Sequence, residues 1–288
     1  MGEVMRLSLA VAALALAVPA VTQAAAKPAA PSPGERYVAM GSSFAAGPGV
    51  GPNKPDTPSR CGRGQFNYPA LLAEKFKLDL VDATCSGATT EHVLGPWKEI
   101  PPQIEAVDAT ARLVTITIGG NDIAFVGNIM AAVCEISAKP DPRCQPWREI
   151  TEADWAADER NLRAIVQGVR KRAPKARIVF VDYITVLPAK DVCPALPITI
   201  ARLEQSRAAA KRLARLTVQV ARSEGAEVFR FSEKSRTHAP CSDKPWSNGM
   251  TAPAEDGIPV HPNRIGHEAA AEGLAAFLGK SPASARRR

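Results

Sequence analysis

Two short runs of apolar, mostly β-branched residues constrain the fold of this chain more than any other feature. They are RLVTITI at Arg112–Ile118 and ARIVFVDY at Ala176–Tyr183. A strand covered on both faces is apolar almost throughout, whereas a strand with one wet face alternates polar and apolar residues. Between the two runs lies the polar-faced segment Glu152–Arg172, which has the length of a helix. Strands that alternate with helices in this way predict an α/β fold with a parallel sheet.

The same alternation extends over most of the chain. Further strands are predicted at Arg36–Gly41, Leu78–Ala83 and Ala226–Phe231, and a Gly- and Pro-rich loop is predicted from 42 to about 65. The other predicted helices are Tyr68–Phe76, Gln103–Asp108, Asp122–Val133, Thr199–Ser223 and Arg264–Leu278.

Three polar segments directly follow predicted strands. They are AMGSSFAAGPG at 39–49, CSGATT at 85–90 and GGND at 119–122. Sites in open α/β sheets lie at the carboxyl ends of the strands, so we expect these segments on one edge of the sheet.

Together with a histidine, the serines, glycines and asparagine of these segments could carry out acyl transfer. A serine hydroxyl requires a base to become a nucleophile, and the chain has four histidines, which are His92, His238, His261 and His267. Acyl transfer also needs donors for a developing oxyanion. The Asn121 amide, the Gly87 backbone N–H and the Ser43 backbone N–H could supply them.

The N-terminus reads as an export signal. Arg6 precedes LSLAVAALALAVPAV, an apolar stretch that is short for a membrane span, and small residues follow it. We predict a signal peptide at 1–26, a flexible lead-in at 27–35, a single domain at 36–280 and a basic tail at 281–288. A membrane anchor is the alternative reading of the first segment.

Six cysteines follow the predicted signal. They are Cys61, Cys85, Cys134, Cys144, Cys193 and Cys241. An even number in an oxidising compartment suggests three disulfides, and six cysteines allow 15 pairings. Zinc binding is the weaker alternative because there is no CxxC pair and histidine is scarce, so we expect no metal.

Four segments resemble, in order, the sequence blocks of the SGNH hydrolases. GSSFAAG resembles the GDSL block, CSGATT the glycine block, IGGNDIAF the GxND block and HPNRIGH the histidine block. The resemblance extends from about Tyr37 to the last helix and is greatest to secreted actinobacterial lipases and esterases. It implies a flavodoxin-like, three-layer α/β/α sandwich with five strands and no cofactor. It also implies the disulfides Cys61–Cys85, Cys134–Cys144 and Cys193–Cys241.

The resemblance assigns roles to individual residues. Ser43 corresponds to the nucleophile and His261 to the base, and Ser43, Gly87 and Asn121 correspond to the oxyanion donors. His267 is interpreted as a buried structural residue, and His92 and His238 as surface or loop residues.

The sequence departs from the family pattern at two positions. Ser42 occupies the place usually held by Asp beside the nucleophile. The acid of the family's DxxH pattern is replaced by Ile258. We expect the Ile258 carbonyl to orient His261, with the carboxylate of Asp256 as the alternative.

The formal charge of +7 favours contact with anionic lipid or an envelope surface, and not specifically with nucleic acid. Five cations of one predicted helix, Arg202, Arg207, Lys211, Arg212 and Arg215, could face such lipid or could simply be solvated. The family resemblance implies a secreted lipase or esterase acting on a small-molecule or lipid ester, and we expect a monomer. The alternatives are a phospholipase, an envelope polysaccharide deacetylase and a catalytically decayed binding protein on the same scaffold.

Overall fold

Five parallel strands form one sheet in the order β2-β1-β3-β4-β5. The computed structural model describes residues 30–55, 57–137 and 144–279, together with Gly2. The strands are β1 (Arg36–Gly41), β2 (Asp79–Asp82), β3 (Ala111–Thr117), β4 (Arg177–Val181) and β5 (Glu227–Phe229). Every residue of β4 and nearly every residue of β3 is buried, as their apolar sequences predict. The predicted α/β fold with a five-stranded parallel sheet is confirmed.

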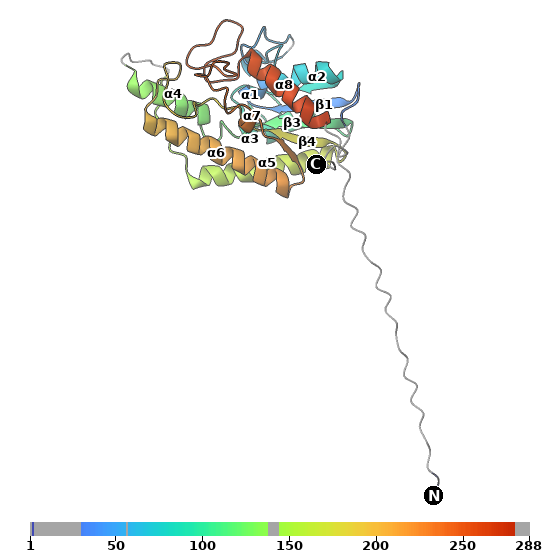
Figure 1. Cartoon of the computed structure of the whole chain (residues 1–288). Helices are drawn as coiled ribbons and strands as arrows, with labels where there is room; N and C mark the ends of the chain where they lie inside the picture. Colours follow the sequence, from blue (N-terminus) through green and yellow to red (C-terminus); the bar gives the residue numbers. More distant parts are fainter. Residues whose placement is uncertain (1, 3–29, 56, 138–143, 280–288) are drawn as a thin grey trace.

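Helices cover both faces of this sheet, which confirms the three-layer sandwich (Figure 1). On one face α2 (Tyr68–Phe76) packs beside α8 (Arg264–Gly279). On the other face α5 (Glu152–Arg172) packs beside α6 (Ile200–Ser223), with α3 (Thr90–Leu94) and α4 (Phe125–Ile136) nearby. In α5 the buried side chains recur three or four residues apart, so a single stripe of the helix faces the core.

The structure corrects four predicted elements. Ser43–Ala46, predicted as loop, is the short buried helix α1. The predicted helix from Asp122 begins as α4 at Phe125, because 120–124 form a turn that ends in left-handed Ala124. The last predicted strand ends at Phe229 and is followed by the short helix α7 (Phe231–Lys234). The helix predicted at Gln103–Asp108 is a 3₁₀ turn that ends at Ala106, and another 3₁₀ turn, Ser59–Cys61, lies in the loop after β1.

The predicted signal peptide, all of it except Gly2, and the predicted basic tail lie outside the described residues. The last part of the predicted lead-in is described: the Gly34 N–H donates to the Lys77 carbonyl at 2.8 Å, which attaches this segment to the end of α2. In the described ranges, no helix is both long enough and apolar enough to cross a bilayer.

Three disulfides join Cys61 to Cys85, Cys134 to Cys144 and Cys193 to Cys241. This confirms the pairing that the family resemblance implied. The first bond links the loop after β1 to the segment after β2, at the edge where the polar segments gather.

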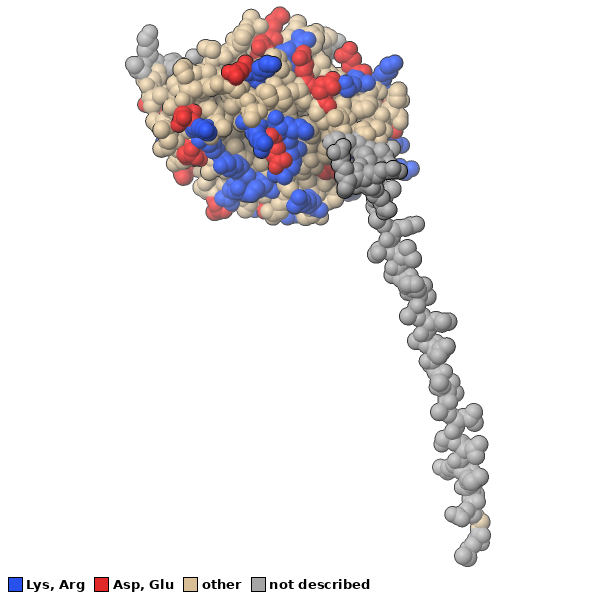
Figure 2. All heavy atoms as spheres, viewed as in Figure 1, with Lys and Arg blue, Asp and Glu red and all other residues tan. Residues whose placement is uncertain are grey.

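Basic side chains gather on the face formed by α6 and α7 (Figure 2). Three of the cations predicted to share this helix are paired: Arg202 with Glu135, Arg207 with Glu204 and Arg212 with Glu152. Lys211 and Arg215 are exposed beside a hollow in the surface.

Candidate active site

Ser43 and His261 lie in direct contact at the carboxyl edge of the sheet. The Ser43 Oγ is 2.8 Å from the His261 Nε2, although the two residues are 218 positions apart. Ser43 is the first residue of α1, directly after β1, and His261 lies in the loop before α8. Ser43 and His261 are each only 7% exposed, so the pair is largely shielded from water.

The turn that carries Ser43 is fixed at Gly41. This residue has a φ of 146°, and a Cβ there would lie 2.5 Å from the Thr117 carbonyl oxygen, so only glycine fits. The Gln103 side chain accepts from the Gly41 N–H at 2.7 Å and donates to its carbonyl at 3.0 Å. Both backbone groups of Gly41 are therefore held by one buried amide.

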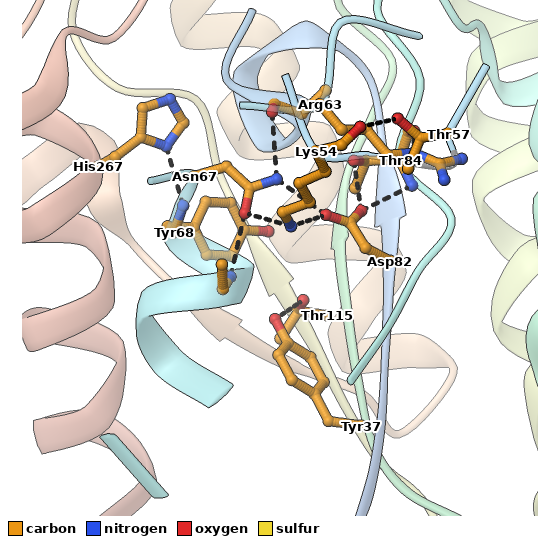
Figure 3. A network of polar contacts seen from close by, with 12 residues as sticks. Tyr37, Lys54, Thr57, Arg63, Asn67, Tyr68, Asp82, Thr84, Thr115 and His267 are labelled. Carbon is orange, nitrogen blue, oxygen red and sulfur yellow. Dashed lines mark hydrogen bonds and ion pairs between the residues drawn. The ribbon is translucent and has the colours of Figure 1, made fainter. Parts of the chain in front are cut away.

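A buried polar network fixes the other end of α1 (Figure 3). The Asn67 amide donates to the Ala46 carbonyl at 3.1 Å and to the Asp82 carboxylate at 2.9 Å. Its oxygen accepts from the Ala70 N–H, which caps α2, and from Lys54. Burial acts to raise the pKa of Asp82, but the nearby Lys54 charge and the hydrogen bonds lower it overall, so the carboxylate is ionised.

His261 is oriented by a backbone carbonyl. Its Nδ1 lies 2.7 Å from the Pro259 carbonyl oxygen. Neither the Ile258 carbonyl nor the Asp256 carboxylate takes this expected role. The carbonyl that does so belongs to the next residue, Pro259, and Asp256 instead accepts from the Arg264 N–H at the start of α8. Val260, between the two partners, has a φ of 59°, a strained value for a β-branched residue. This tight turn brings the Pro259 carbonyl back to the ring.

The carbonyl fixes the tautomer of His261. Since a carbonyl can only accept, Nδ1 carries the proton and Nε2 is free to accept from the Ser43 hydroxyl. Burial lowers the pKa of His261 to about 4, against a smaller opposing effect of the Pro259 hydrogen bond. The imidazole is therefore neutral near pH 7, the form that a general base needs.

The predicted oxyanion donors lie in the segments that follow β1, β2 and β3. Ser43 begins a helix, so its N–H has no acceptor within that helix. Gly87 has a φ of 85°, and the Trp97 ring covers its α-carbon, where a Cβ would lie 3.0 Å from the ring. The Asn121 amide donates to the Ala88 carbonyl at 2.9 Å, which holds its side chain beside the Gly87 segment. Asn121 is only partly buried, and its amide has a second N–H.

Tyr183 is a site residue that the sequence analysis missed. Its hydroxyl lies 3.2 Å from the Ser42 Oγ and accepts from the Gly120 N–H at 2.9 Å. Its ring lies 4.7 Å from that of Phe44, which in turn lies 4.9 Å from the His261 ring. Tyr183 thus links the nucleophile turn to the loop that carries Asn121. Ser42, which replaces the family's Asp, takes part in this link.

Two carboxyl groups lie in or beside the loop that carries Asn121. Asp122 accepts from both the N–H and the hydroxyl of Thr90, which attaches the loop to α3. Asp158 is fully buried, and neither of its oxygens has a hydrogen-bond partner in the described part of the chain. Burial raises the pKa of Asp158 to about 8, with a smaller contribution from Asp122. At neutral pH it is therefore largely an uncharged acid.

The other histidines lie in structural positions. His267 is buried, its Nδ1 accepts from the Tyr68 N–H, and burial lowers its pKa to about 3. His92 stacks on Trp97, and His238 stacks on Trp246. Over residues 30–55, 57–137 and 144–279, no group of three or more His, Cys, Asp or Glu side chains is placed to hold a metal.

Comparison with known proteins shows what this chain is similar to. Residues 39–269 match the model of the GDSL-like Lipase/Acylhydrolase family. The chain is 32% identical to Lipase 2 of Streptomyces coelicolor over 94% of each chain, and 30% identical to a lipase of Streptomyces rimosus over 80% of this chain and 81% of the other.

Solved structures show the same fold. The crystal structure of an extracellular lipase from Streptomyces rimosus superposes with a TM-score of 0.64 at 25% identity, covering 84% of this chain and 98% of that one. A phospholipase A1 from Streptomyces albidoflavus superposes with a TM-score of 0.66 at 24% identity, covering 84% and 99%.

Proposed function

This chain belongs to the GDSL-like lipase/acylhydrolase family, and we propose that it hydrolyses lipid esters through an acyl-enzyme formed on Ser43. It is a carboxylic ester hydrolase, as its family and its Streptomyces relatives are. One observation carries the proposed mechanism: the Ser43 hydroxyl is hydrogen-bonded to a neutral imidazole whose other nitrogen is held by a carbonyl.

In the proposed first step, His261 Nε2 takes the proton of the Ser43 hydroxyl while Oγ attacks the ester carbonyl. The tetrahedral oxyanion accepts hydrogen bonds from the Ser43 and Gly87 N–H groups and from the Asn121 amide. Collapse of this intermediate breaks the ester C–O bond. His261 then gives the proton to the departing alcohol, and the acyl group remains on Ser43.

In the second step water attacks the acyl-enzyme, with His261 again as the base. The charge on the imidazolium in each transition state is stabilised by the Pro259 carbonyl dipole. A full carboxylate would stabilise it more strongly, but the carbonyl supplies the same orientation and tautomer.

The choice of lipid over polysaccharide as the ester source rests on two observations. Two relatives that match over 94% and 80% of this chain are named lipases, and basic residues gather on the face of α6 and α7. We infer that the enzyme is secreted, since the chain has three disulfides and resembles an extracellular lipase; that it is a monomer stays a prediction.

The two adjacent serines give a matched test of the nucleophile. Ser43→Ala should lower kcat for p-nitrophenyl butyrate by about 10⁴-fold or more, because the acyl-enzyme cannot form. Ser42→Ala removes the hydroxyl contacts with Tyr183 and with the Thr117 carbonyl and should cost about tenfold or less in kcat. An organophosphonate should add to Ser43, as read by mass spectrometry of the peptides.

The same assay tests the alternatives. Full activity of Ser43→Ala, or labelling at Ser42, would refute the mechanism. A wild-type protein without ester hydrolysis would indicate a decayed binding protein. A series of acyl-chain lengths run beside an acetylated polysaccharide distinguishes a lipase from a deacetylase.

A further inference from the structure

A cavity of about 440 Å³ lies between α6, the segment after β4 and α7. Its lining does not include Ser43, Gly87, Asn121 or His261. The volume falls within the range of small-molecule binding pockets, about 300–1,000 Å³. The proposed chemistry therefore leaves this cavity unexplained.

The interior wall of the cavity is largely apolar; the Asp182 carboxyl also lines it, and this carboxyl accepts hydrogen bonds from the N–H and hydroxyl of Ser232. Ile184, Val186 and Leu187 come from the segment after β4, and Leu213 comes from α6. The hollow exists because α6 presents small residues here: Ala210 and Ala214 lie one turn apart on the helix face that lines it. A wall of this kind favours a hydrocarbon chain over water.

The rim of the same cavity is strongly basic. Arg207, Lys211 and Arg215 recur every four residues along α6, and Arg230 and Arg236 flank α7. Figure 2 shows blue side chains gathered over this part of the surface.

Some of these charges are already compensated. Arg207 pairs with Glu204, and Arg230 pairs with Glu233. For Lys211, Arg215 and Arg236, no ion pair is found among the described residues. Three exposed cations thus face one apolar hollow.

We propose that this cavity is a second binding site, separate from the nucleophile, for a single-chain anionic amphiphile. The carboxylate or phosphate head lies at Lys211, Arg215 and Arg236, and the alkyl chain lies against Ile184 and Leu213. A neutral hydrocarbon leaves the three cations without a counter-ion, and a small inorganic anion leaves the apolar wall uncovered. Only a ligand with both parts satisfies both halves of the cavity.

Tyr183 separates this site from the nucleophile turn. It lines the cavity, and its hydroxyl contacts the Ser42 Oγ. A bound amphiphile therefore lies against the same ring that supports the site of hydrolysis, but it does not occupy that site.

Binding is tested on the Ser43→Ala protein, so that turnover cannot affect the result. Isothermal titration with laurate and with dodecyl phosphate should each show one bound equivalent. Inorganic phosphate and dodecyltrimethylammonium should bind at least tenfold more weakly. Comparing laurate with dodecyl phosphate shows whether a fatty acid or a phosphate-headed lipid fits better.

Charge variants then locate the site. The triple variant Lys211→Gln/Arg215→Gln/Arg236→Gln should weaken laurate binding at least tenfold. Ala214→Leu, which fills the hollow, should weaken laurate binding while leaving the charges in place. The matched control removes three exposed cations of α5, Arg160, Lys171 and Arg172, with the same change in net charge, and should bind laurate as the parent does.

The proposal is overturned if the triple variant and the control bind laurate equally. It is also overturned if monomeric laurate does not bind and only phosphatidylglycerol vesicles do, which would indicate a membrane-facing surface. Hydrolysis by the protein with Ser43 intact is measured separately, so a failed cavity and a failed nucleophile assignment give different results.

Discussion

The Nδ1 of His261 lies 2.7 Å from the carbonyl oxygen of Pro259, two residues earlier in the chain. This contact replaces the carboxylate that usually orients a catalytic histidine. The nearest acid in sequence, Asp256, accepts instead from the Arg264 N–H at 2.7 Å. A dyad of serine and histidine supported by a backbone dipole therefore accounts for the geometry without a third side chain.

Asp256→Ala should lower the free energy of unfolding and leave kcat nearly unchanged. The lost hydrogen bond caps the first turn of α8, so the free energy of unfolding should fall by about 1 kcal/mol. Since Asp256 does not touch His261, kcat should change by about threefold or less, whereas loss of a triad acid costs about 10⁴-fold. Ester kinetics and thermal unfolding measure the two effects. A kcat loss of a thousandfold with a normal Tm would show that Asp256 acts on the histidine.

As the pH is lowered, kcat/KM should fall with a midpoint near pH 4. Burial holds the pKa of His261 at about 4, so the base remains neutral well below the usual range of histidine. The unfolded chain binds this proton near pH 6.5 and the folded chain does not, so this group makes stability fall as pH drops from 6.5 towards 4. Circular dichroism at each pH must therefore show that the protein is folded. A midpoint for the fall of kcat/KM near pH 6.5, measured on folded protein, would contradict a buried base.

Asn121→Ala should lower kcat by about 10²–10³-fold, the usual loss for one oxyanion donor. KM should change less, because the hydrogen bond strengthens only as charge develops on the substrate oxygen. Asn128→Ala is the matched control: this buried amide of α4 binds both the N–H and the carbonyl of Arg148. The control should lower Tm and largely keep kcat. Equal kcat losses in the two variants would remove Asn121 from the oxyanion site.

Asp158→Asn should change how stability depends on pH. With a folded pKa of about 8, the folded chain keeps this proton while the unfolded chain loses it near pH 4. Between these values the wild-type protein loses stability as pH rises, by up to about 1.4 kcal/mol per pH unit. The amide does not titrate, so the variant should gain in Tm relative to wild type between pH 5 and pH 8.

The exposed Asp243→Asn serves as the control for this experiment and should show no such trend. Because each variant is compared with itself at two pH values, any cost of burying the amide cancels. Parallel pH profiles for wild type and Asp158→Asn would show that Asp158 is ionised and solvated in the folded protein.

Local patterns were sufficient to predict most of the fold. The bounds of α2 and α5 match the sequence prediction because Asn67 and Thr151 cap them and polar faces mark their length. The strands were found because residues buried on both faces must be apolar. Helix α1 has no sequence signature because its short, mostly small residues resemble a loop; these four residues are buried and pack against β1 and β3.

The candidate site was predictable only where a side chain has a sequence signature. Ser43 and His261 lie in recognisable segments, and the structure brings them together. The Pro259 carbonyl has no signature, because every residue has a carbonyl and only the turn at Val260 selects this one. Asp158 lies on a polar helix, where the sequence cannot distinguish it from a solvated acid. The role of Tyr183 rests on its contact with Ser42, and no local pattern predicts a contact between residues 141 positions apart.

The separation of 218 residues between Ser43 and His261 has a consequence for when the protein becomes active. The supports of the nucleophile, Gln103 and Asn67, lie within about 60 residues of it, so this end of the site can assemble while the chain is still being made. The proposed base, His261, reaches Ser43 only when the last helix has folded, since closing so long a loop comes late in folding. Ester hydrolysis should therefore begin only when folding is complete, and no shortened chain that lacks the last helix should hydrolyse an ester.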